Sequence, residues 1–171
     1  IFVVGAPWDG PSRRGSAYVY TYTEAGELSE EKLEPSDGGN SDEFGTSVAV
    51  FGPLILVGAP KHIVSGNPTG AVYVFEQQAN GAWEEQPEKL VALDSASDDL
   101  FGSSVAIDGL TAVVGAKRNS NTGSFRGAAY VFERNADGAW SRVRLDEPSD
   151  VEDQDGFGSG VTIENDVLIV G

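Results

Sequence analysis

Aspartates placed ahead of three Phe-Gly pairs are the residues whose types and spacing could do chemistry. In each copy one aspartate is followed after four residues by a second, and one further residue precedes the phenylalanine. Carboxylates can bind Ca²⁺ together with backbone carbonyls, or they can close turns by accepting backbone hydrogen bonds. A third interpretation is direct contact with a ligand. The aspartates concerned are Asp37, Asp42, Asp94, Asp99, Asp150 and Asp155.

Calcium is the one cofactor that this pattern suggests, and its best position is the last copy. There Glu152 and Asp153 lie between Asp150 and Asp155, so that four carboxylates fall within six residues. The turn interpretation applies to all three copies, because a repeated turn repeats its side-chain acceptor. The sequence leaves both interpretations open and favours the turn.

Residues for catalysis are scarce. The chain has no cysteine and one histidine, His62, which excludes Cys/His nucleophiles and most transition-metal sites. His62 lies in the segment PKHIVSGNP and is expected to be a solvated loop residue. The segment GFGSG (156–160) resembles a phosphate-binding loop, but it leads into a strand rather than a helix. We therefore expect no catalytic residues and no enzyme activity.

Composition limits the partners. The 171 residues carry a formal net charge of −16. Such a surface repels nucleic-acid phosphates and anionic membranes, so neither is an expected partner. No apolar run approaches the roughly 18 residues that span a bilayer. The absence of cysteine excludes disulfides but does not decide the compartment.

A long repeat dominates the sequence. Phe44, Phe101 and Phe157 are spaced by 57 and 56 residues. Each unit holds a small-residue strand, a continuous apolar run, a Tyr-Val-aromatic segment and a charged segment, which lies at 24–33 in the first copy. Four short strands in about 55 residues are typical of a β-propeller blade. We predict an all-β propeller of four-stranded antiparallel blades, with a β-sandwich or a solenoid of hairpins as the alternative.

The unit starts also carry a family resemblance. Phe-Gly at each start and Gly-Ala-Pro at 5–7 and 58–60 resemble FG-GAP repeats, the blades of integrin α-subunit propellers. The tryptophan and Tyr-Val-Phe segments are similar to related repeats of bacterial and algal surface proteins. There are two departures, Lys117 in place of the proline and Leu28 where the later copies have tryptophan.

The resemblance implies a non-catalytic extracellular or cell-surface module that works by protein or glycan recognition in adhesion. It does not extend to the calcium loop of integrin-type repeats. The links between first and second strands read FGP, DGL and END, which are too short and too poor in acid for a DxDxDG loop.

The chain is expected to form one partial propeller over 1–171. Residues 1–33 would hold strands two to four of one blade, 44–90 and 101–145 two full blades, and 157–171 strands one and two of a further blade. The resemblance implies a closed ring of about seven blades, of which about half is present. Open ends would expose strand edges. We expect the polypeptide to continue at both ends, or other chains to cover them.

Charge is divided between two classes of link. The links into first strands contain 13 of the 27 acidic residues, and the links between second and third strands contain six of the 11 basic residues. Both classes emerge on the same face of a propeller, so this face should alternate in charge. The acidic links are 34–43, 91–100 and 146–156, and the basic links are 8–15, 60–69 and 117–127.

The expected partner face consists of the basic links and one tryptophan, which could either bind a ligand or pack against its turn. Its residues are Trp8, Arg13, Arg14, Lys61, Lys117, Arg118 and Arg126. The expected partners are other protein chains, the missing blades of the same polypeptide, or a glycan. An alternative is a structural subunit of an extracellular fibre or large assembly. A weaker alternative is part of a larger enzyme, or an enzyme with a ligand at the propeller axis.

Overall fold

The computed structural model describes residues 1–22 and 26–171, and for Pro11 the backbone alone. Over these residues the protein is all-β, with one 3₁₀ turn, η1 (Pro11–Arg13), and no α-helix. Residues 24 and 25, where the first charged segment was expected to begin, lie outside the described residues. A helix with the length and hydrophobicity needed to cross a membrane does not occur in the described part of the chain.

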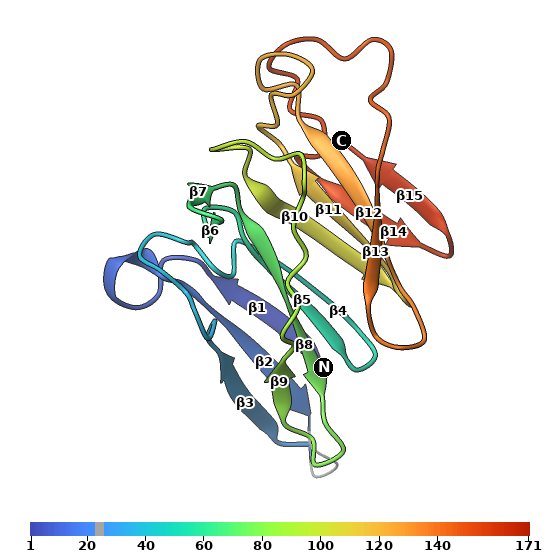
Figure 1. The fold of residues 1–171 in the computed structure, drawn as a ribbon. Helices are drawn as coiled ribbons and strands as arrows, with labels where there is room; N and C mark the ends of the chain where they lie inside the picture. The colour runs from blue at the N-terminus through green and yellow to red at the C-terminus, as the bar shows by residue number, and fades with distance from the viewer. Residues whose placement is uncertain (23–25) are drawn as a thin grey trace.

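Four antiparallel sheets follow one another along the chain, and we number them blades I to IV (Figure 1). Blade I consists of β1 (Phe2–Ala6), β2 (Ser16–Tyr22) and β3 (Leu28–Leu33). Blade II consists of β4 (Ser47–Phe51), β5 (Leu54–Ala59), β8 (Ala71–Gln77) and β9 (Trp83–Glu85). Blade III consists of β10 (Phe101–Asp108), β11 (Thr111–Ala116), β12 (Ala128–Arg134) and β13 (Trp140–Arg144). Blade IV consists of β14 (Val161–Glu164) and β15 (Val167–Val170), and a small hairpin of β6 (Ile63–Val64) and β7 (Asn67–Pro68) lies in the link from β5 to β8.

Within each blade the strands pair in chain order, which is the meander expected of a propeller blade. The first strands β4, β10 and β14 lie next to one another, so the blades are arranged around a common inner side. The described residues close no ring. The all-β architecture of four-stranded antiparallel blades is therefore confirmed, with part of a propeller present.

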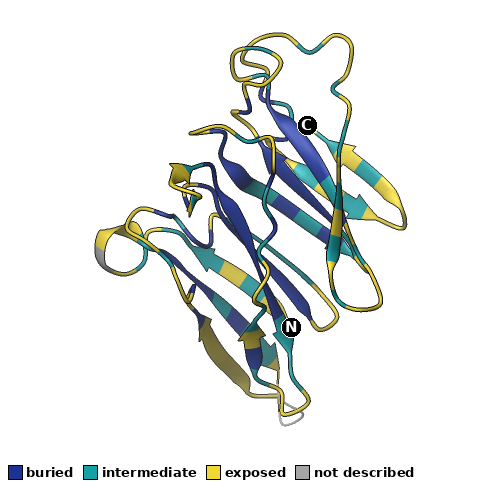
Figure 2. Ribbon diagram, viewed as in Figure 1, coloured by how far each residue is buried: buried dark blue, intermediate teal, exposed yellow. Residues whose placement is uncertain are grey.

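The hydrophobic core lies between the blades. Alternate residues of a strand point to opposite faces of its sheet. In β5, Ile55 and Val57 accordingly join the cluster between blades I and II, and Leu54 and Leu56 join the cluster between blades II and III. Because both faces of blade II are covered, this strand is buried along its whole length (Figure 2). That is why its sequence is continuously apolar rather than alternating.

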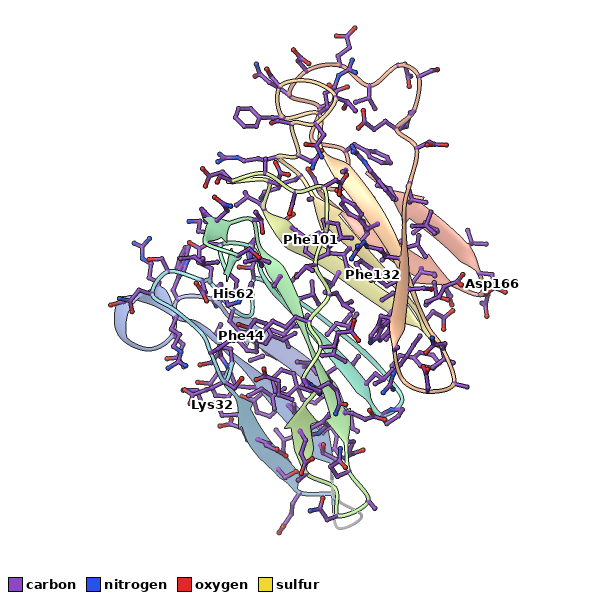
Figure 3. All side chains as sticks on the ribbon, viewed as in Figure 1. Lys32, Phe44, His62, Phe101, Phe132 and Asp166 are labelled. Carbon is purple, nitrogen blue, oxygen red and sulfur yellow. The ribbon has the colours of Figure 1, made fainter. Side chains whose placement is uncertain are left out.

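The repeated phenylalanines lie in these two clusters. Phe44 and Phe101 are fully buried, and both rings lie between the ribbons of neighbouring blades (Figure 3). Phe101 makes edge contacts with Tyr130 and Phe132, at ring-centroid distances of 5.5 and 6.0 Å. Such edge-to-face packing is favourable for aromatic pairs. The phenylalanine therefore works as a wedge between blades.

The glycines of the repeat allow backbones of adjacent blades to touch. A Cβ built on Gly58 would lie 2.1 Å from the carbonyl oxygen of Gly102, the glycine of the next Phe-Gly pair. Gly102 itself has a φ of +85°, a conformation that side chains disfavour. The same approach recurs from Gly5 to Gly45 and from Gly115 to Gly158, with Cβ distances of 1.9 Å. Phe-Gly and Val-Gly recur together because a side chain on the Val-Gly glycine would collide with the backbone of the Phe-Gly glycine in the next blade.

The outer strand of blade II departs from the repeat. β9 ends at Glu85, which pairs with Phe75, and Gln86 N–H still donates to the Val74 carbonyl (2.8 Å). The next residue to pair with the sheet is Leu90, opposite Val72. Five steps along the outer chain therefore match three steps along β8, a bulge of two extra residues. Proline lacks the N–H that a ladder requires, and Pro87 lies in this bulge. The charged outer strand of blade II is thus interrupted.

Candidate functional site

The acidic and basic links lie together at one end of the blades, and we call this surface the link face. One backbone hydrogen bond joins each of the three acidic links to the basic link of the preceding blade, at an equivalent position each time. Ser41 N–H donates to the Ser12 carbonyl (2.8 Å), Asp98 N–H to Pro68 (2.9 Å) and Gln154 N–H to Ser124 (2.9 Å). The expected gathering of both link classes on one face is confirmed by these bonds.

The second aspartate of each acidic link closes its own turn. One Oδ atom of Asp42, Asp99 and Asp155 accepts the backbone N–H of the residue three positions earlier, at 2.8, 2.7 and 2.8 Å. These are the loop-closing bonds expected of turn aspartates. Asp42 and Asp99 are buried, whereas Asp155 is exposed.

His62 is buried rather than solvated, and the expectation from the sequence was wrong on this point. Its Nδ1 lies 2.7 Å from Asp42 Oδ2, and its ring lies edge-on to Tyr73. Blade III has an amide in the same place, where Asn119 Nδ2 donates to Asp99 (2.8 Å). Burial raises the pKa of Asp99, against hydrogen bonds that act to lower it. Each buried aspartate thus has a hydrogen-bond partner four residues after its repeat glycine.

In two of the three acidic links the first aspartate joins a tyrosine to a cation. Asp37 accepts the Tyr73 hydroxyl (2.8 Å) and pairs with Lys89 (2.5 Å). Partial burial acts to raise the pKa of Asp37, but the hydrogen bonds from Lys89 and Tyr73 hold it below its ordinary value. Burial and the neighbouring Asp37 carboxylate raise the pKa of Tyr73 far above its usual range, so its hydroxyl stays a donor.

Blade III repeats this cluster of aspartate, tyrosine and cation. Blade I has the same cluster, but its aspartate comes from a different link. Asp94 accepts the Tyr130 hydroxyl (2.9 Å) and pairs with Arg144 (3.0 Å). In blade I the carboxylate comes from Asp9, in the second-to-third link, which accepts from Tyr18 (2.9 Å) and pairs with Lys32 (3.0 Å). The hydrogen bond from Lys32 holds the pKa of Asp9 well below its usual range. The cluster therefore fixes the links to the blade, whichever residue supplies the carboxylate.

The last acidic link is the least engaged of the three. Asp150 is exposed, and a tyrosine 36 residues later, the spacing of the other two pairs, would fall beyond Gly171. Asp153 accepts from Ser124 N–H (3.1 Å) and lies 3.5 Å from Arg126 Nε. Among residues 1–22 and 26–171, three metal-ligating acidic or histidine side chains nowhere gather at one point. Calcium binding over 150–155 stays a prediction.

Three of the six expected cations are used within the link face. Arg14 Nη2 donates to the Pro35 carbonyl (3.0 Å), Lys61 pairs with Glu43 (2.7 Å), and Arg126 donates to the Val151 carbonyl (2.5 Å). The other three, Arg13, Lys117 and Arg118, are exposed and form no ion pair with any residue that the structure describes.

Two aromatic side chains project from this face beside free arginines. Trp8 is 73% exposed, and the Arg13 guanidinium lies 5.9 Å from its ring centroid. Phe125 is 48% exposed, and the Arg118 guanidinium lies 5.7 Å from its ring. Cation–π contacts at these distances hold the arginine against the ring. Trp8 therefore does not pack into its turn.

Sequence reasoning missed Phe125. It also missed Ile63, which lies on the basic link between those of Trp8 and Phe125. Ile63 is 58% exposed, so each of the three basic links presents one large apolar side chain to solvent. A signal was available for Phe125, because it precedes Arg126-Gly127 just before a strand and lies outside the apolar pattern of the blade. The repeat does not predict the exposure of Phe125, because Phe125 lies closer to the following strand than Trp8 and Ile63 do.

The fold and the link face together define part of a β-propeller whose blades are built on Phe-Gly and Val-Gly contacts. Comparison with protein-family models matches the FG-GAP repeat at residues 28–75 and again at 83–132, more than half of the chain. The chain belongs to the FG-GAP repeat family. No curated protein matches the sequence.

Proposed function

We propose that this chain is a non-catalytic recognition module of an extracellular or cell-surface protein, and that its link face binds a partner protein. The observation that carries the proposal is the pair of exposed aromatics, Trp8 and Phe125, each beside an arginine on equivalent links. Tryptophan and arginine are enriched among the residues that dominate binding at protein interfaces. FG-GAP repeats occur in extracellular and surface proteins, which supports the location.

The charges of the link face indicate the kind of partner. Arg13, Lys117 and Arg118 form no ion pair with a described residue, while the chain as a whole carries a net charge of −16. A partner with carboxylates opposite these cations and its own cations around them would be complementary. Its binding should weaken with salt, because the Debye length falls from ~10 Å at 0.1 M to ~3 Å at 1 M.

The test compares two matched double variants of the chain. Trp8→Ala with Phe125→Ala removes the aromatics of the link face. Phe51→Ala with Leu110→Ala removes exposed apolar side chains, 44% and 55% exposed, from the hairpins at the opposite end of the blades. All four positions are exposed, so each exchange should change the free energy of unfolding by no more than about 0.5 kcal/mol.

Proteins of the native extracellular fraction are cross-linked to each variant and quantified by mass spectrometry. We expect the link-face variant to lose specifically bound proteins that the hairpin variant and the parent chain retain. Equal capture by all three would contradict recognition through the link face.

A further inference from the structure

An open cleft lies at the outer edge between blades II and III, away from the link face. Its volume is about 290 Å³, at the lower end of the range for ligand pockets. One wall is the bulge of blade II, residues 86–88. The opposite wall is the β12–β13 turn, residues 137–139, and Trp140 and Arg134 complete the lining. We call it the Trp140 cleft.

The wall of this cleft is where the repeat is broken. The equivalent cleft between blades I and II has the regular strand β3 as its wall and Trp83 in the place of Trp140. Trp83 is 8% exposed, whereas Trp140 is only partly buried. β-Bulges often re-aim side chains beside functional sites. The bulge of blade II thus lies beside Trp140, the more exposed of the two equivalent tryptophans.

Of the polar groups of the cleft, Arg134 is held in place by two partners. Arg134 pairs with Glu76 of the neighbouring blade (2.6 Å) and donates from Nε to the Gly138 carbonyl (3.2 Å). Its side chain is 14% exposed, so the guanidinium is nearly fixed. Glu88 is exposed and has no hydrogen bond or ion pair with a described residue, which leaves its carboxylate free to accept.

The lining of the cleft combines apolar and polar groups. Trp140 and Pro87 offer apolar surface to the C–H groups of a pyranose ring, and Gln86, Glu88 and Asp137 offer acceptors and donors to its hydroxyls. We propose that the Trp140 cleft binds a neutral saccharide. The proposal does not rest on the link face and goes beyond partner-protein binding.

Other ligand classes fit the cleft less well. An anion would find no free cation, because Glu76 already neutralises Arg134. An apolar ligand would bury the Glu88 carboxylate, at a large desolvation cost. A quaternary ammonium could lie on Trp140 beside Glu88, but its N-methyl groups form no hydrogen bonds with Gln86 and Asp137, which also line the cleft.

The experiment uses the whole chain labelled with ¹⁵N, whose three tryptophans give three indole N–H signals. The probes are cellotetraose, laminaritetraose, mannotetraose, xylotetraose and chitotetraose at millimolar concentration, with choline as the cationic probe. We expect at least one saccharide to shift the Trp140 signal in a saturable way, with no shift of Trp8 or Trp83. Glu88→Gln should weaken this binding about tenfold, the effect of one hydrogen bond to a charged acceptor.

Matched variants separate binding from folding. Glu88 is exposed on a bulge, so its exchange leaves the fold intact, and Trp140→Phe keeps an aromatic ring in the packing while removing the indole. Trp8→Ala should bind the saccharide as the parent does. The proposal is overturned if no saccharide shifts Trp140, if the shift appears at Trp8 instead, or if choline alone binds.

Discussion

Replacing Phe101 by alanine tests the packing that holds two blades together. The side chain is fully buried, belongs to the cluster between blades II and III, and contacts Tyr130 and Phe132 edge-on. Truncation would leave a cavity between two sheets whose backbones are already in contact at Gly58 and Gly102. The site therefore has little freedom to collapse.

The expected loss is about 3–5 kcal/mol in the free energy of unfolding, the range for truncation of a buried phenylalanine. Domains are typically stable by about 5–15 kcal/mol in total, so the variant should lose a large part of its stability. Urea unfolding followed by both tryptophan fluorescence and circular dichroism measures this loss, and agreement of the two probes checks that the blades unfold together.

Phe157→Ala is the matched control for this prediction. Phe157 occupies the equivalent position at the start of blade IV, but it is only partly buried in this chain. Its truncation should therefore cost clearly less than that of Phe101. A loss below about 1 kcal/mol for Phe101, or equal losses at the two positions, would refute the wedge between blades.

Three further predictions concern the repeat glycines and aspartates. Gly58→Ala should destabilise the protein by about 1–3 kcal/mol or more in urea unfolding, because its Cβ would meet a backbone carbonyl at 2.1 Å, while Gly160→Ala, with open space around it, should not. Asp37→Asn should destabilise the protein at neutral pH. Because the folded pKa of Asp37 is lowered, its contribution is present above about pH 3.9 and is lost as pH falls further, so melting curves of variant and parent should converge in acid. If Ca²⁺ binds over 150–155, it should raise the melting temperature of the parent and not that of the Asp150→Asn, Asp155→Asn variant; equal melting of both proteins with calcium and with chelator would exclude the metal.

The blade architecture could be predicted from the sequence because its physical causes are local and repeated. The Phe-Gly and Val-Gly positions recur at a fixed period, and the continuous apolar run of residues 54–59 is what a strand buried on both faces requires. The link face could be anticipated in the same way, since the two classes of link differ consistently in charge.

The clusters beneath the link face could be predicted only in part. The spacing of 36 residues between Asp37 and Tyr73 recurs between Asp94 and Tyr130, so a search for paired polar positions would have found it. His62 was misjudged because its segment PKHIVSGNP contains two prolines, a glycine, a serine and an asparagine, which are typical of exposed loops. Its burial depends on Asp42, twenty residues away, and no local pattern encodes that contact.

The features that the sequence did not predict occur in only one copy of the repeat. Among the described blades the bulge at residues 86–88 exists in blade II alone, and Pro87, which cannot donate to the ladder, is its one local sign. The exposure of Phe125 likewise depends on the length of its own link. Features shared by all copies are easier to predict than features of one copy, because repetition itself is the signal.

The central claim, that the link face recognises a partner, is tested most directly by hydrogen–deuterium exchange on the chain with and without its captured partner. We predict that binding slows exchange in the links 8–15 and 117–127 and leaves the hairpins at 51–54 and 108–111 unchanged. Protection confined to those hairpins or to the outer strands β3 and β13, with the two links exchanging as in the free chain, would contradict the claim.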